Sequence, residues 1–148
     1  MKNIKIVEVV ECKSNYVKVI NCLLTQLTPN ASIFTKDDLN AIISSDSSHL
    51  FLLFYHEKVV GMLTIGHYKC PTGIKYWIED VVVDKEYRGK RLGFALLEHA
   101  KDFVSAQQKG VLMLTSNPSR IAANNLYQNI GFEPRDTNVY RMIFEDDE

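Results

Sequence analysis

The chain has 148 residues, of which 46% are apolar and 24% charged, so its length and composition fit one globular domain spanning residues 1–148. A formal net charge of -1 offers no basic field for nucleic acid, and the apolar runs fall far short of the roughly 20 residues that cross a bilayer. We therefore expect a cytoplasmic protein that binds neither nucleic acid nor membrane.

The first third of the sequence predicts a strand followed by two helices. Residues 4–10 alternate between apolar and other side chains, which favours a strand. Apolar residues at helical spacing follow it, in a helix that Asn15 is placed to cap and Pro29 to end. Thr35 opens a second, shorter helix with acidic residues in its first turn.

The middle of the sequence predicts three strands in succession. Residues 50–55 are almost continuously apolar, and a turn separates them from residues 59–68, as in an antiparallel hairpin. Gly61 and Gly66 within the second arm indicate bulges or the close approach of another backbone. A further strand runs through residues 76–83.

The last third predicts a helix, a strand, a helix and a final strand. The first helix covers about residues 91–107, and the buried strand 111–115 follows it. Residues 120–130 form the second helix, and Gly131 stands where a helix commonly ends. Residues 138–144 alternate as a last strand. This order predicts one mixed, mostly antiparallel α/β sheet with helices on both faces.

The stretch 78–97 stands out because an apolar strand leads through a turn containing Gly89 and Gly93 into an amphipathic helix. Free N–H groups at a helix start bind anions, and glycines let the backbone approach a ligand. The turn also carries four cations, at Lys85, Arg88, Lys90 and Arg91. We expect it to bind a diphosphate, although a solvated basic helix start has the same composition.

Other ligand motifs are absent. The sequence contains no Gly-Lys-Ser or Gly-Lys-Thr and no three-glycine dinucleotide fingerprint, so common nucleotide folds are disfavoured. The four histidines lack metal-ligand spacing, and the three cysteines suit neither a disulfide framework nor zinc. We therefore expect no metal.

With Arg88 and Gly93 at its ends, the turn resembles the pyrophosphate loop of the GNAT superfamily of acetyl-CoA-dependent N-acetyltransferases. Arg91 stands where that loop usually has its inner glycine, and its side chain is then available to phosphate. Residues 123–132 are similar to the family's late helix, although Arg120 replaces a common asparagine. Residues 79–90 also resemble glucosamine-phosphate N-acetyltransferases locally.

The resemblance implies a GNAT-like fold, acetyl-CoA as co-substrate and a set of coenzyme contacts. Backbone N–H groups near Val81 and Val83 are the expected oxyanion and pantetheine contacts, because the family splays this strand from its neighbour there. The implied coenzyme-binding residues are Val81, Val82, Val83, Arg88, Gly89, Lys90, Arg91, Leu92, Gly93, Phe94, Asn124 and Tyr127.

Acetyl transfer from a thioester to an amine requires a neutral amine, a donor to the oxyanion and a proton source for the thiolate. In a regular strand Glu79 and Asp80 point to opposite faces, so at most one faces the amine, directly or through water. We favour Glu79 as the base because it would share its face with Val81 and Val83. Tyr127 is the candidate acid, although a core tyrosine would look the same.

Two functions are compatible with these patterns. The first is an N-acetyltransferase acting by direct attack on a primary amine in a ternary complex. The resemblance implies that residues 28–34 and 135–140 set its specificity, because those segments flank the open end of the split strands in the family. Its acceptor is a small molecule or a protein amine, and a homodimer is possible. The second is a sensor or interaction domain that binds acyl-CoA without turnover, which needs the turn but neither base nor acid.

Overall fold

The computed structural model describes residues 3–146, so the first two and last two positions of the expected 1–148 domain lie outside the described residues. The chain forms two compact units, one ending at Thr115 and the other beginning at Ser116. No helix within residues 3–146 is long and apolar enough to cross a membrane.

The first unit contains most of the regular structure. Its elements are β1 (Ile4–Glu8), α1 (Ser14–Leu27), α2 (Lys36–Ile43), β2 (Ser48–Tyr55), β3 (Lys58–Cys70), β4 (Gly73–Val83), the 3₁₀ turn η1 (Lys85–Tyr87), α3 (Leu92–Ser105) and β5 (Val111–Met113).

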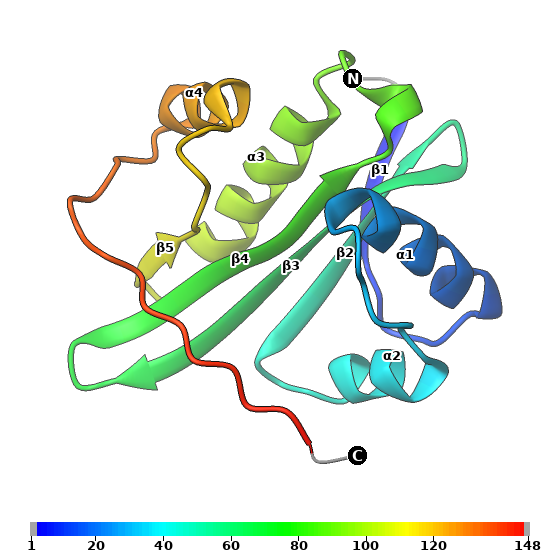
Figure 1. Cartoon of the computed structure of the whole chain (residues 1–148), viewed down its shortest axis with the longest axis horizontal. Coiled ribbons are helices and arrows are strands. Elements are labelled where there is room, and N and C mark those ends of the chain that lie inside the picture. The colour runs from blue at the N-terminus through cyan, green and yellow to red at the C-terminus, as the bar shows by residue number, and fades with distance from the viewer. Residues whose placement is uncertain (1–2, 147–148) are drawn as a thin grey trace. The chain divides into compact units, whose positions relative to one another are not determined.

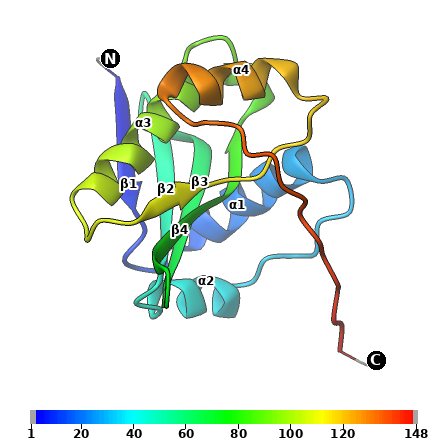
Figure 2. The same cartoon turned by 90° about the vertical axis from the view of Figure 1, so that its left-hand side faces the viewer.

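The five strands form one sheet in the order β1-β2-β3-β4-β5 (Figure 1). The first three pairings are antiparallel, and β4 pairs with β5 in parallel. Figure 2 shows α3 on one face of this sheet and α1 and α2 on the other. The expected mixed, mostly antiparallel sheet with helices on both faces is therefore confirmed.

The starts of the two N-terminal helices differ in how they are capped. Thr35 accepts a hydrogen bond from the Asp38 backbone N–H and donates its own N–H to the Asp38 carboxylate, a complete capping box. That second bond holds the pKa of Asp38 below its usual value. The expected cap at Asn15 is wrong, because α1 begins at Ser14 after Lys13, which makes no side-chain cap. Packing therefore stabilises α1 more than capping does.

Alternation along the strands supplies a separate hydrophobic core to each face. The core beneath α1 and α2 contains Val9, Ile20, Leu23, Leu39, Leu50, Leu52, Val59, Met62 and Val82. The α3 side buries Leu92, Leu96, Leu97 and Ala100 of the helix. Both cores lie in the first unit, so this unit has an apolar interior of its own.

The expected close approach of another backbone occurs at Gly61, where β4 lies against β3. A Cβ at Gly61 would lie 3.1 Å from the Val82 carbonyl oxygen and 3.4 Å from Leu96 Cδ1. A bulge also shifts the pairing of β2 with β3 immediately beside it. A Cβ at Gly66 would instead lie 3.9 Å from the Ser47 carbonyl oxygen, an ordinary van der Waals contact. Gly61 therefore lets β3 pack tightly against β4 and α3.

The second unit contains α4 (Ile121–Ile130), and Gly131 ends that helix with φ 122°, as expected. The predicted last strand at residues 138–144 is wrong. Its large apolar side chains are exposed, by 61% at Ile143 and 87% at Phe144. A strand needs a neighbour for its backbone hydrogen bonds, and within residues 3–146 the sheet consists of β1 to β5 without residues 138–144. The alternation was thus insufficient to define a strand.

We expect Gly61→Ala to lower the free energy of unfolding by about 1–3 kcal/mol, because the new methyl group must displace backbone atoms of β4. Gly66→Ala on the same strand is the matched control and should be neutral or slightly stabilising. Urea denaturation measures both. Equal effects of the two substitutions would contradict the role assigned to Gly61.

Candidate active site

A bulge interrupts β4 at the centre of the predicted site. Thr64 of β3 pairs with Glu79, and Met62 pairs with Val82, so two residues of β4 lie opposite the single residue Leu63. Asp80 is one of these two and has a left-handed backbone, with φ 53°. A bulge interrupts the regular ladder of backbone hydrogen bonds and bends the strand. β4 remains paired with β3 on both sides of the bulge, whereas its pairing with β5 is limited to Lys75, Tyr76 and Trp77.

The bulge also changes which residues share a face with Glu79. Paired residues lie on the same face, so Glu79 shares the α1 and α2 face with Thr64, Met62 and Val82. The expectation that Glu79 shares its face with Val81 and Val83 is wrong, since it assumed unbroken alternation. The extra residue reverses the alternation between Glu79 and Val82.

Glu79 and Asp80 are adjacent carboxylates, and both residues are exposed. Partial burial raises the pKa of the Glu79 carboxyl above its usual value, and the negative charge of Asp80 raises it further. A carboxylate with a raised pKa is a stronger base than an ordinary surface carboxylate. Glu79 nevertheless remains exposed to solvent.

The turn after β4 provides the expected anion-binding geometry. Gly89 and Arg91 both have left-handed backbones, with φ 82° and 62°, and α3 begins at Leu92. The first N–H groups of a helix have no partner within it, so those of Leu92, Gly93 and Phe94 point out of the helix start. With the positive end of the helix dipole, they form a site suited to phosphate.

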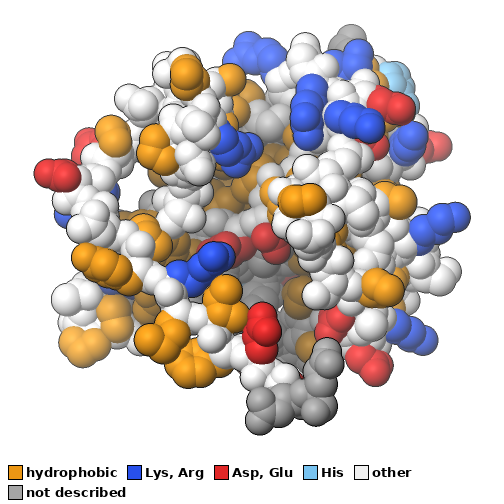
Figure 3. Space-filling view, viewed as in Figure 1, with side chains coloured by type: hydrophobic (Ala, Val, Ile, Leu, Met, Phe, Trp, Pro, Cys, Tyr) orange, Lys and Arg blue, Asp and Glu red, His pale blue; other side chains and the backbone are white. Residues whose placement is uncertain are grey.

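The basic side chains of this turn are exposed, and several lysine and arginine side chains gather over η1 and the start of α3 (Figure 3). Arg88 Nε donates to the Val83 carbonyl at 3.1 Å, which ties the turn to the end of β4. Lys90 Nζ lies 5.8 Å from the centre of the Tyr55 ring. The turn thus combines positive charge with local anchoring.

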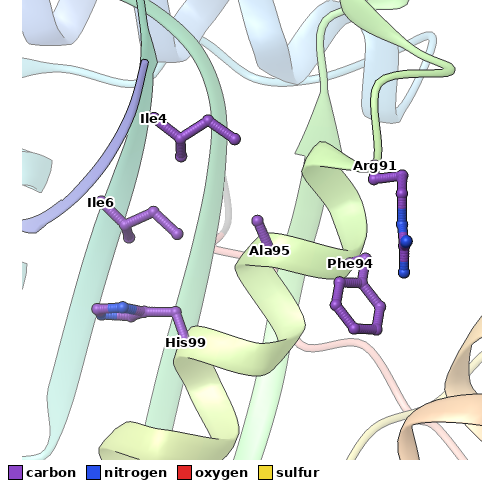
Figure 4. Close-up of a pocket in the computed structure, with 6 residues that line it drawn as sticks. All are labelled: Ile4, Ile6, Arg91, Phe94, Ala95 and His99. Atoms are coloured by element: carbon purple, nitrogen blue, oxygen red, sulfur yellow. The ribbon is translucent and has the colours of Figure 1, made fainter. Parts of the chain in front are cut away.

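The Arg91 side chain packs on an aromatic ring. Its guanidinium carbon is 4.6 Å from the centre of the Phe94 ring, a cation–π contact one turn into α3. Both side chains also line a cavity of about 420 Å³, whose walls are Ile4, Ile6, Arg91, Phe94, Ala95 and His99 (Figure 4).

This cavity does not contain the predicted base. Ile4 and Ile6 of β1 pair with Tyr55 and Leu53, which places them on the α3 face of the sheet, whereas Glu79 lies on the other face. Burial lowers the pKa of His99 in the cavity wall, so its imidazole tends to stay neutral. The predicted chemistry therefore lies along β4 and the turn, outside this cavity.

The second unit carries the other two predicted residues. Tyr127 is largely buried in α4, and its ring lies 6.3 Å from that of Phe132. Asn124 donates through Nδ2 to the carbonyls of Asn117 and Arg120, at 2.9 and 2.8 Å. Asn124 thus holds the turn that precedes α4.

Three polar residues far apart in the sequence form a network that the sequence analysis missed. His49 Nδ1 lies 2.8 Å from a Glu8 carboxylate oxygen, and His49 Nε2 lies 3.0 Å from His67 Nε2. Their common face could be found only once β1, β2 and β3 were placed side by side. Among residues 3–146 no group of three or more His, Cys, Asp or Glu is arranged to hold a metal ion.

The left-handed backbone of Arg91 should lower the stability of the folded protein by a measurable amount. Such a conformation costs a non-glycine residue about 1–3 kcal/mol, so Arg91→Gly should be about 1 kcal/mol more stable than Arg91→Ala. Both variants lose the contact with Phe94, and the difference between them therefore isolates the backbone. Denaturant unfolding measures it, and equal stabilities would show that the turn accommodates a side chain without strain.

Comparison with known proteins agrees with this architecture. The model of the Acetyltransferase (GNAT) family matches residues 17–132. Streptothricin acetyltransferase of Escherichia coli is 26% identical over 110 residues, which cover 71% of this chain but 59% of that relative.

Solved structures are similar in fold at low sequence identity. An aminoglycoside acetyltransferase from an uncultured soil metagenomic sample superposes with a TM-score of 0.82 at 17% identity, covering 96% of this chain and 97% of that one. Glucosamine-6-phosphate N-acetyltransferase from Arabidopsis thaliana has a TM-score of 0.79 at 23% identity, covering 97% and 100% of the two chains. With its strand, turn and helix start and a family match over most of its length, the chain belongs to the GNAT acetyltransferase family.

Proposed function

We propose that the protein is an N-acetyltransferase that moves the acetyl group of acetyl-CoA to a primary amine by direct attack in a ternary complex. The bulge in β4 is the observation that carries this proposal, because it lies between a carboxylate of raised pKa and an anion-binding helix start. Membership of the family supports acetyl-CoA as the donor. The family match spans parts of both units, which supports their action as one domain.

The turn would hold the diphosphate of the coenzyme. In this proposal the N–H groups at the start of α3 bind phosphate oxygens, and Arg88 and Lys90 balance their charge. Arg91 contributes its backbone N–H, since its side chain packs on Phe94. The N–H groups of Val81 to Val83, next to the bulge, would contact the pantetheine arm and the oxygen of the thioester carbonyl.

Glu79 would make the amine nucleophilic. An amine attacks only when neutral, and a carboxylate with a raised pKa accepts its proton more readily than an ordinary carboxylate does. The same carboxylate acts directly or through an intervening water. Asp80 raises the pKa of Glu79, and we assign it that supporting role.

Tyr127 would return a proton to the departing thiolate. Its place in the match to the family's late helix supports this role, and a phenol O–H can donate a proton. A thiolate is a good leaving group, so we expect the acid to contribute less than the base. Asn124 would contact the coenzyme one turn earlier on the same helix.

The acceptor we propose is a small-molecule amine. Two similar structures are named as acetyltransferases of an aminoglycoside and of glucosamine 6-phosphate, and the similar E. coli enzyme is named for streptothricin. Residues 28–34 and 135–140 would select among such amines. A lysine or an N-terminal amine of a protein is the alternative acceptor.

The test is release of free thiol from acetyl-CoA with a panel of amines. The panel contains glucosamine 6-phosphate, an aminoglycoside, streptothricin and a lysine-containing peptide. Thiol release above the rate without amine is expected for at least one small molecule. Saturable binding of acetyl-CoA without turnover of any amine would instead favour the sensor, and turnover of the peptide alone would contradict a small-molecule acceptor.

The pH dependence of kcat/KM separates the two carboxylates. Activity should rise with pH as Glu79 loses its proton, with a midpoint above the usual glutamate pKa of about 4.3. Asp80→Asn removes a charge that raises the pKa of Glu79, so it should move this acid limb to lower pH and keep turnover. Glu79→Gln should remove the limb and lower kcat by about 10²–10⁴-fold.

The reverse outcome would assign the base differently. If Asp80→Asn abolishes the acid limb and Glu79→Gln preserves it, Asp80 is the base. Preservation of the limb in both variants would leave neither carboxylate responsible for it.

A further inference from the structure

The C-terminal end of α1 is tied to the strand that carries Glu79. Gln26 in the last turn of α1 accepts a hydrogen bond at 2.8 Å from the backbone N–H of Lys85, two residues beyond the end of β4. Because α1 covers the face of the sheet on which Glu79 lies, the segment that follows α1 starts on that face. Its first N–H, at Thr28, is bound to the Leu24 carbonyl at 3.0 Å.

The same segment is held at its other end by one side chain of α1. Asn21 Oδ1 accepts from the Phe34 N–H at 2.8 Å, and Asn21 Nδ2 donates to the Phe34 carbonyl at 2.8 Å. The amide therefore pairs with the Phe34 backbone as a neighbouring strand would. Nδ2 also donates to the Val17 carbonyl at 2.9 Å, which fixes the amide against its own helix.

Residues 28–33 thus form a loop with both ends fixed. Phe34 is half-buried against the core beneath α1 and α2, and the capping box of Thr35 begins α2 directly after it. Most of the loop itself is exposed, including Ile33 at 82%. An exposed apolar side chain on a loop whose ends are held rigidly is suited to contact a ligand.

We propose that Asn21 is a positioning residue that fixes the loop 28–33 as a wall of the acceptor-amine site. This inference rests on the proposed acetyltransferase function. Asn21 itself lies behind the loop and acts through Phe34, without touching the substrate. Loss of the amide frees one end of the loop while leaving the turn at residues 88–94 intact.

The test compares Asn21→Ala with Thr25→Ala, using the small-molecule amine of the panel with the highest kcat/KM. Thr25 is the matched control because its hydroxyl donates to the Cys22 carbonyl on the same helix and does not hold the loop. Asn21→Ala removes both hydrogen bonds to the Phe34 backbone, and a loss of at least about 1 kcal/mol predicts an increase of about five-fold or more in KM for the amine. KM for acetyl-CoA should stay within about two-fold of wild type, and Thr25→Ala should change neither value.

Hydrogen exchange at the Phe34 N–H reports the clamp independently of turnover. It should be protected in the wild type and in Thr25→Ala, and faster in Asn21→Ala. Asn21→Asp supplies a second variant if Asn21→Ala does not fold, since it keeps the acceptor for Phe34 and loses both donated bonds. We expect it too to raise KM for the amine selectively.

The outcomes separate this inference from the proposed function. A wild-type protein that turns over no amine overturns the proposed function and the positioning role that rests on it, even when exchange at Phe34 shows the clamp. An active wild type whose Asn21 variant exchanges faster but keeps its KM for the amine overturns the positioning role alone. Equal increases in KM for amine and acetyl-CoA would likewise contradict it, because they indicate a general loss of structure.

Discussion

The local geometry of the candidate site depends on one extra residue in β4. Because two residues of β4 face Leu63, side chains before the bulge and after it follow opposite alternation. Tyr76 and Ile78 are buried on the α3 side of the sheet, and Val82 enters the core beneath α1 and α2. A single strand therefore contributes to both cores, and the backbone between them is freed from regular pairing. Glu79 lies immediately before this change of alternation.

Most of the fold could be predicted from the sequence because the relevant signals are local. Apolar periodicity located all five strands of the sheet and all four α-helices, and Thr35 and Gly131 marked ends that the structure confirms. Residues 138–144 show the limit of such reasoning. Alternation reports which side chains could share a face, but a strand also needs a partner, and partners are defined by distant residues.

The site was harder to predict than the fold because its decisive features are relations between strands. Residues 81–83 are all valine, so an apolar side chain is available to each core whichever way the alternation runs. Nothing in the run therefore marked the bulge, and the expectation that Glu79 shares its face with Val81 and Val83 was wrong. Glu8, His49 and His67 also gave no local signal, because each lies on a different strand. The basic turn was predictable because its charges and glycines are adjacent in sequence.

Two residues with strained backbones and an unfavourable pair of charges lie at this site. Among residues 3–146 the non-glycine residues with positive φ are Asn3, His56, Glu57, Asp80 and Arg91. His56 and Glu57 form the two-residue turn between β2 and β3, where positive φ matches the twist of a hairpin. Asp80 and Arg91 have no hairpin to explain them, and Asp80 also places a second negative charge beside Glu79. The left-handed backbones of Asp80 and Arg91 do not favour folding, since each costs about 1–3 kcal/mol of folding free energy. Asp80 and Arg91 are separated only by the end of β4 and the turn that follows it. Strain at two positions so close together is the pattern expected where a backbone is shaped for binding and catalysis.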